Sequence, residues 1–202
     1  MVHISPEEMS ERENYKFLIG SIIPRPIALI TSVSEDEVLN IAPFSYFNIV
    51  TANPPIVSVS LQRKNDSLRD TARNLLENKE AVIHVVDVEN VDDANETAAS
   101  LRPDESELDK TNFTVIPSKT METPSLEESK VRFEVELYEH VLVENEGEPT
   151  ADLMLLKINH YHIDDDLYHE GRIDPIGLGA VSRLAGHDYG EIGKIFTRAR
   201  PE

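Results

Sequence analysis

Strand-like segments joined by short turns constrain the fold of this chain most strongly. Residues 27–33 and 39–42 are apolar and flank a polar turn at 34–37, which is typical of two paired strands. Residues 56–61 alternate between apolar and polar side chains with a period of two. The sequence Asn53-Pro54-Pro55 separates this strand from the preceding pair. The first third of the chain is therefore predicted to be mainly β.

The second half of the chain continues this pattern. A buried strand is predicted at 81–86, and two long strands at 131–143 and 151–163 are joined by a longer-loop hairpin at 144–149. Most of these strands neighbour one another in sequence. That order favours an antiparallel barrel with attached helices over a doubly wound parallel sheet.

Helices are predicted at two places. Ser5-Pro6-Glu7-Glu8 is a capping-box sequence that should begin a helix over about 6–18. Asp66 or Ser67 should cap a second helix that ends near Asn78. The span 89–128 is acidic and broken by prolines, and we interpret it as an excursion of helices and loops that covers one end of the core. Without a visible linker, residues 1–202 are expected to form a single domain.

Composition excludes several classes of protein. The chain has 202 residues, of which 40% are hydrophobic, so it can bury a substantial core. It has no cysteine, and its net charge of -19 opposes binding to nucleic acid. Pro24-Arg25-Pro26 interrupts the longest apolar run, 17–33, so no membrane span is expected. Without a secretory signal, the expected location is the cytoplasm.

Short polar side chains within the apolar strands indicate a lined cleft. Each such group must find a partner or cost about 1–3 kcal/mol when it is buried. A basic cluster follows these strands, within a strongly acidic chain. A flat heteroaromatic ligand with a phosphate tail would match a cleft with polar groups, aromatic cover and nearby cations. The residues concerned are Thr31, Ser32, Asn40, Ser45, Asn48, Ser58 and Ser60 in the strands, and Arg63, Lys64, Arg69 and Arg73 in the cluster.

Other sites are less well supported by the sequence. Gly177-Leu178-Gly179 lacks the third glycine of a dinucleotide-binding loop and comes after the strands. A metal-binding β-barrel is a lower-ranked alternative, in which His160 and His162 on one strand face share a cation with aspartates at 164–166. No third ligand stands at a recognisable spacing, so no metal is assigned.

Four segments in order resemble the flavin reductase-like family of FMN-binding split-barrel proteins. They are "GSIIPRPIALITSVSEDEVLNIAPFSYFN" (20–48), "DTARNL" (70–75), "LYHEGRID" (167–174) and "RLAGHDYGEI" (183–192). The resemblance implies a six-stranded antiparallel Greek-key split β-barrel with peripheral helices. It also implies a homodimer, FMN as cofactor, and electrons from NADH or NADPH that pass to flavin or to a partner flavoprotein oxygenase. An FMN-containing electron carrier without nicotinamide activity stays open as an alternative.

The resemblance also implies which residues bind the cofactor. The isoalloxazine and ribityl wall would comprise Arg25, Thr31, Ser32, Asn40, Ala42, Pro43, Ser45, Phe47 and Asn48. Ser60, Gln62, Arg63, Asp70 and Thr71 would reach the ribityl chain and phosphate, although Asp70-Thr71 could instead be an N-cap. Arg183 and His187 belong to the last segment, where Ala185 replaces a glycine common in the family. His169 lies in the segment that resembles the family's nicotinamide-facing stretch.

Overall fold

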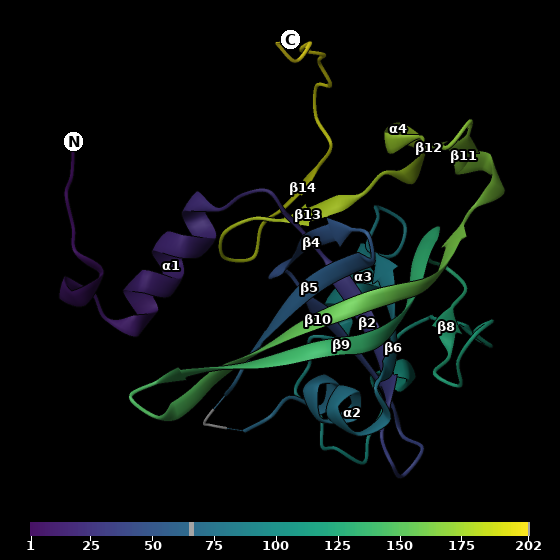
Figure 1. Ribbon diagram of the computed structural model, residues 1–202, viewed down its shortest axis with the longest axis horizontal. Helices are drawn as coiled ribbons and strands as arrows, with labels where there is room; N and C mark the ends of the chain where they lie inside the picture. The colour runs from purple at the N-terminus through teal and green to yellow at the C-terminus, as the bar shows by residue number, and fades with distance from the viewer. Residues whose placement is uncertain (65–66, 202) are drawn as a thin grey trace.

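The computed structural model describes residues 1–64 and 67–201, and its centre is a seven-stranded antiparallel sheet (Figure 1). The strands follow the order β3-β2-β6-β9-β10-β5-β4. The mainly β, antiparallel prediction is confirmed, whereas the count of six strands is not. The bounds are β2 Ala28–Val33, β3 Leu39–Phe44, β4 Phe47–Ala52, β5 Pro55–Gln62, β6 Glu80–Val85, β9 Val131–Asn145 and β10 Glu148–Ile163.

Strand β4 is an element that the sequence reading did not predict. It pairs with β5 through Asn53-Pro54, the segment that was expected only to break the chain. Its residues include β-branched Ile49, Val50 and Thr51, which favour an extended backbone. The strand was missed because its side chains are largely exposed and show no clean alternation. β4 therefore forms one edge of the sheet.

The β9–β10 hairpin extends well beyond the body of the molecule (Figure 1). Asn145 pairs with Glu148 directly across the turn, so only Glu146 and Gly147 form the loop. Both have positive φ, 52° and 88°, as a type I′ turn requires. The prediction of a longer loop is thus wrong, because the chain reverses in two residues and the strands continue to the turn.

Helix α2 (Asp70–Asn78) covers one face of the barrel and completes its main core. Ala72 and Leu75 are fully buried against strands β2, β5, β6, β9 and β10. The helix begins later than expected: Arg69 is its N-cap, without a side-chain cap, and Ser67 forms a bridge with Lys64 instead. Asp66, the other predicted cap, lies outside the described residues.

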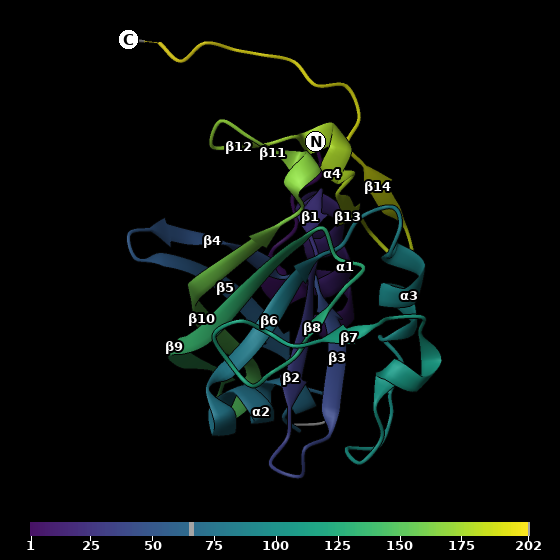
Figure 2. The same ribbon diagram turned by 90° about the vertical axis from the view of Figure 1, so that its right-hand side faces the viewer.

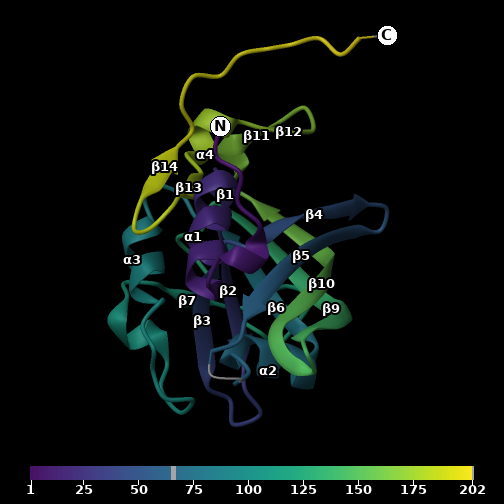
Figure 3. The same ribbon diagram turned by 90° about the vertical axis from the view of Figure 1, so that its left-hand side faces the viewer.

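The N-terminal segment contains two short helices rather than one. η1 (Pro6–Glu8) has the predicted capping box, but a second capping box at Ser10 and Glu13 starts α1 (Glu11–Ser21) in a new direction. Within α1, which the structure describes in full, only Ile19 is buried, and Phe17 remains 62% exposed. Figure 3 shows α1 lying on the outside of the strands.

The acidic excursion flanks β3, as Figure 2 shows. It comprises α3 (Val91–Glu96), η2 (Glu107–Lys110), β7 (Val115–Ile116) and β8 (Ser125–Leu126). A second apolar cluster lies between it and the sheet, where Ile41 and Leu29 pack against Phe113 and Leu126. The excursion is therefore anchored to the barrel and forms a wall beside β3.

The C-terminal part returns to the start of the barrel. β13 (Val181–Arg183) pairs with both β1 (Arg25–Pro26) and β14 (Tyr189–Glu191). The connection from β10 contains η3 (Asp165–Leu167), β11 (Tyr168–His169), β12 (Arg172–Ile173) and α4 (Pro175–Leu178). In the described residues, no helix has the length and apolar character needed to cross a membrane.

Candidate functional site

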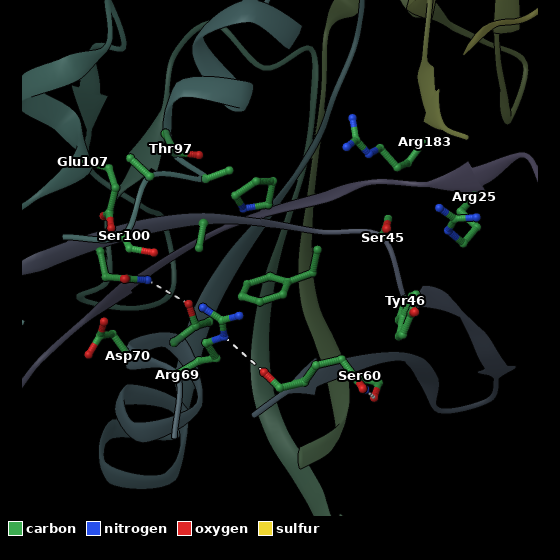
Figure 4. A pocket seen from close by; sticks show the side chains of 18 of the residues that line it. Arg25, Ser45, Tyr46, Ser60, Arg69, Asp70, Thr97, Ser100, Glu107 and Arg183 are labelled. Atoms are coloured by element: carbon green, nitrogen blue, oxygen red, sulfur yellow. Dashed lines mark hydrogen bonds between the residues drawn. The ribbon is translucent and has the colours of Figure 1, made fainter. Parts of the chain in front are cut away.

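A cavity of about 450 Å³ lies where β3, β5, the start of α2, the acidic excursion and the segment after β13 meet (Figure 4). Its wall is mixed: Ala42, Pro43 and Phe44 provide apolar surface next to hydroxyl, amide and guanidinium groups. The predicted site residues that line it are Arg25, Asn40, Ala42, Pro43, Ser45, Ser60, Gln62, Asp70, Thr71 and Arg183.

Asn40 is held in the cavity wall by a buried polar network. Its Nδ2 donates to Thr71 Oγ1 at 2.8 Å and to Ser32 Oγ at 3.4 Å. Asn74 Nδ2 also donates to Ser32 Oγ, at 3.1 Å. Ser32 is fully buried and absent from the cavity lining. Its place is beneath Asn40, where it orients the amide instead of facing the cavity as predicted.

Strand β3 presents its outer edge to the acidic excursion. Pro43 has no backbone N–H. Proline is tolerated on an edge strand where the N–H would point away from the neighbouring strand and form no bond within the sheet. The backbone N–H of Ile41 donates to Glu107 Oε2 at 2.9 Å. Glu107 is 6% exposed and belongs to the cavity lining. The edge of β3 is thus closed by a carboxyl group from the excursion.

Arg25 lines the cavity, and three hydrogen bonds hold its guanidinium within the protein. Its Nη1 donates to Ile19 O at 2.8 Å and Ile22 O at 2.7 Å, and its Nη2 donates to Leu184 O at 2.8 Å. Nε is buried and has no partner among the described residues. The guanidinium therefore ties α1 to the segment after β13, which are two walls of the cavity. These bonds shape the site, and the buried Nε remains an unused donor among the described residues.

Arg69 is the cation placed for an anionic group. Its Nε donates to Gln62 O at 3.1 Å, and Figure 4 shows its guanidinium directed into the cavity. Beside it are the first N–H groups of α2, which lack a side-chain cap and carry the positive end of the helix dipole. Asp70 is ion-paired with Arg73, so the N-cap alternative for Asp70-Thr71 is wrong.

Arg63 was predicted to contact the phosphate, but in the structure its guanidinium binds the carboxylate of Asp152. Its Nε and Nη2 each lie 2.9 Å from an oxygen of Asp152, which also contacts His140 Nε2 at 2.9 Å. Burial raises the pKa of Asp152, but the hydrogen bonds from Arg63 and His140 outweigh it and hold that pKa below its usual value. Arg63 therefore stabilises the junction of β5, β9 and β10.

Other predicted wall residues also lie outside the cavity. Thr31 is fully buried and its Oγ1 donates to Pro124 O at 2.7 Å. Phe47 and Asn48 line a separate apolar groove of about 480 Å³ along β4. The chain turns after Tyr46, which carries the two side chains away from the cavity.

Two histidines predicted as site residues, His169 and His187, do not line the cavity either. His169 is exposed in the β11–β12 hairpin, and His187 lines a surface pocket beside Tyr189. Arg183 lies 4.4 Å over the Tyr189 ring and donates to Gly186 O at 2.7 Å, which fixes it at the cavity rim. A nicotinamide-facing role for His169 stays a prediction.

The lower-ranked metal alternative lacks a complete ligand set. His160 and His162 do share a strand face, with ring centroids 4.7 Å apart. His162 Nε2 instead contacts Glu134 Oε1 at 2.6 Å, and Asp164 caps η3. Throughout residues 1–64 and 67–201, no three His, Asp or Glu side chains are grouped around a common point.

Several lining residues were missed by the sequence reading, among them Thr97, Ser100 and Glu107. These three and Tyr46, which was expected as aromatic cover for a ligand ring, face the cavity (Figure 4). Burial raises the pKa of Glu107 and also that of Tyr46. Tyr46 lies within the segment that carries the family resemblance. Nothing in the local sequence distinguishes Glu107 from the other acids of the excursion.

The fold and site define a class of antiparallel β-barrel proteins with a mixed polar and apolar cavity, and comparison with known proteins identifies the family. Residues 19–177 match the flavin reductase like domain, so the chain belongs to this family. An uncharacterised protein of Halalkalibacterium halodurans is 43% identical over 98% of this chain and 96% of its own.

Solved structures agree with this assignment. Nitrilotriacetate monooxygenase component B from Bacillus cereus is 45% identical, with a TM-score of 0.96 over 98% of both chains. A flavin reductase with a split barrel domain from Shewanella frigidimarina is 21% identical, with a TM-score of 0.85 over 100% of both chains, and shows the shared fold. The split-barrel prediction is thereby confirmed.

Proposed function

We propose that this protein is an FMN-binding oxidoreductase of flavin reductase type, which takes electrons from NADH or NADPH and passes them to flavin. The observation that carries the proposal is the cavity, in which an apolar wall, fixed amides and hydroxyls, and an uncapped helix start with Arg69 lie together in a flavin reductase-like chain. Its volume is in the range of small-molecule sites.

The residues present fit FMN. Pro43 and Phe44 offer apolar cover for a flat ring, and Asn40 offers an amide whose orientation is fixed by Thr71. The buried, unpartnered Nε of Arg25 is a donor that the described part of the protein leaves unused. Bound FMN would supply the capacity to accept and release electron pairs. The protein would supply orientation, exclusion of water and the electrostatic environment.

The phosphate is assigned to the start of α2. Arg69 would donate charge-assisted hydrogen bonds, and the first N–H groups of the helix would supply neutral donors to the same anion. Ser60 and Gln62, which bond each other at 3.3 Å, stand between this end and the rest of the cavity and suit the ribityl hydroxyls.

Titration with FMN tests this assignment. The wild type should quench flavin fluorescence at saturation, and Arg69→Ala should weaken binding by roughly tenfold to a hundredfold because charge-assisted hydrogen bonds are lost. Arg102→Ala is the matched control, since it removes the same charge from a side chain that is 71% exposed. A wild type that binds no flavin, or equal losses in both variants, would overturn the assignment.

Nicotinamide activity is tested separately from flavin binding. Steady-state oxidation of NADH and NADPH is measured with excess free FMN, and the reductase proposal expects turnover that depends on both substrates. Flavin binding without nicotinamide oxidation would instead favour the electron carrier. That result would leave the cavity assignment intact and remove only the reductase activity.

A homodimer and an oxygenase partner are also part of the proposal. Ile49 on β4 is 77% exposed and Phe17 on α1 is 62% exposed, so each element has an uncovered apolar face. Burial of such faces in a second copy would be favourable. Similarity to a monooxygenase component B supports an oxygenase as the acceptor. Analytical ultracentrifugation tests the dimer, and a monomer at micromolar concentration would exclude it.

Domain organisation and location stay predictions. A single domain over 1–202 should unfold in one cooperative transition that circular dichroism and fluorescence report identically. The cytoplasmic location comes from the sequence reading and is tested by cell fractionation.

A further inference from the structure

Glu107 is a buried carboxyl group in the cavity wall, and its protein donors are backbone N–H groups. It begins η2, where Ser106 Oγ accepts from Leu108 N at 3.3 Å and fixes the local backbone. Its Oε2 accepts from Ile41 N–H at 2.9 Å, which sets the direction of the carboxyl group. The backbone N–H of Glu107 itself is a second donor to the carboxyl group, and among the described residues Glu107 forms no ion pair. The side chain is nevertheless part of the cavity lining.

The groups around Glu107 are mostly uncharged. β3 presents the amide of Asn40 and the methyl of Ala42, and the segment after α3 presents Thr97 and Ser100. Lys110, on the same short helix, is exposed and acts only through its charge. Lys110 and the two backbone N–H groups favour the ionised form, but burial of the carboxyl group outweighs them.

The charged residues on the other elements around Glu107 either bond to other groups or are exposed to solvent. Asp70 on α2 is paired with Arg73, and Arg69 is bonded to Gln62 O. On α3, Asp93 binds Asn112, while Asp92 and Glu96 are exposed. Burial raises the pKa of Glu107 above its ordinary value. Burial therefore makes protonation of Glu107 easier than that of an exposed glutamate.

We propose that Glu107 contacts the cofactor as a carboxylic acid, pairing with the pyrimidine edge of the flavin and taking up a proton when flavin binds. The inference rests on the proposed flavin function. That edge carries an N–H between two carbonyl oxygens, and a neutral carboxyl group offers an acceptor and a donor side by side. A carboxylate offers acceptors only, and its charge would oppose the anionic phosphate in the same cavity.

The proposal gives a definite pH dependence. In the free protein Glu107 ionises as pH rises, so binding must then return a proton, and the dissociation constant increases with pH. The increase approaches about tenfold per pH unit once the free carboxyl is ionised. The substitution Glu107→Gln would mimic the acid, since an amide also donates and accepts.

The experiment measures dissociation constants for FMN and riboflavin between about pH 5.5 and pH 8.5 by fluorescence quenching. Riboflavin lacks the phosphate, so a trend shared by both ligands excludes phosphate ionisation as its cause. Glu107→Gln should retain the low-pH affinity of the wild type and lose the pH dependence. Glu107→Ala should bind about five- to tenfold more weakly at low pH, because hydrogen bonds are lost.

Asp109→Asn is the control, because Asp109 is an exposed carboxyl on the same short helix outside the cavity lining. It should keep the wild-type profile. If Glu107→Gln also keeps that profile, or if Glu107→Ala binds like the wild type, the role of Glu107 is overturned while the flavin proposal stands. If the wild type binds neither ligand at any pH, the flavin proposal fails and this inference with it.

Discussion

Glu107 and Glu134 are both buried glutamates, but they differ in the number of hydrogen-bond donors around the carboxyl group and in the direction of their pKa shifts. Glu134, on β9, is 0% exposed and accepts from Lys119 N at 2.7 Å, Thr120 N at 2.8 Å, the Thr120 hydroxyl and His162 Nε2 at 2.6 Å. Burial alone would raise its pKa, but these donors outweigh it and lower the pKa to about 2. Glu107 has two backbone donors, Ile41 N–H and its own N–H, and burial outweighs them and raises its pKa.

The difference shows that burial does not decide the charge of a carboxyl group by itself. A carboxylate surrounded by donors is a structural element, because its removal leaves those donors unpaired. A carboxyl group with fewer donors that also lines a cavity can still bind a ligand. The following changes test this contrast, beginning with the largest expected effect.

Glu134→Gln should lower the free energy of unfolding by about 3 kcal/mol, because an amide cannot accept all of the donors that now meet the carboxylate. Urea denaturation at neutral pH measures the change. Glu136→Gln, on the same strand but half-exposed and paired with Lys157, is the control and should cost under about 1 kcal/mol. Equal losses in the two variants would contradict the structural role of Glu134.

Arg63→Met should cost about 2–3 kcal/mol, because it leaves the buried carboxylate of Asp152 with His140 as its remaining side-chain partner. Arg69→Met, at an exposed position, should change unfolding by less than about 0.5 kcal/mol. The pair of urea curves separates a structural arginine from a ligand-facing one. A stable Arg63→Met variant with weakened FMN binding would restore the original phosphate assignment.

His84 is a buried base, and burial shifts its pKa in the direction opposite to that of a buried carboxyl group. Its Nδ1 lies 3.1 Å from Leu29 O and its Nε2 accepts from Leu126 N at 2.9 Å, so the ring is neutral. Burial lowers its pKa from 6.5 to about 3. The unfolded chain therefore binds the proton first, and stability falls as pH drops below 6.5.

The His84 contribution should amount to about 2 kcal/mol between pH 6.5 and pH 5. It is measured as the difference in pH dependence between the wild type and His84→Gln in urea unfolding. Groups such as Glu107, whose raised pKa acts in the opposite direction, contribute equally to both proteins. Parallel pH profiles would show that His84 does not carry the effect.

Glu107→Gln should have the smallest effect, within about 0.5 kcal/mol at neutral pH, because the amide oxygen can still accept from Ile41 N–H. Thermal unfolding followed by circular dichroism measures it beside Glu134→Gln. A loss of stability as large as that of Glu134→Gln would show that Glu107, like Glu134, is needed for the stability of the fold.

Much of the fold could be predicted because periodicity and turn residues are local signals. The strands 27–33, 39–42, 56–61 and 81–86 were placed within a residue or two. β4 was missed because an exposed edge strand leaves little alternation in the sequence.

The site was only partly predictable, since side-chain partners are set by tertiary contacts. The spacing of the basic cluster could not reveal that Arg63 meets Asp152, which lies 89 positions away. Nor could it show that Arg25 binds three carbonyl oxygens. Glu107 reaches β3 across 66 positions, a contact that only the fold creates.

The closed edge of β3 also bears on how the protein behaves when it is concentrated. An edge strand with free N–H groups is a template for strands of other molecules and hence for fibril growth. Here Pro43 lacks the N–H and Glu107 occupies that of Ile41. The same carboxyl group that faces the cavity thus denies other chains a starting point for intermolecular sheet formation.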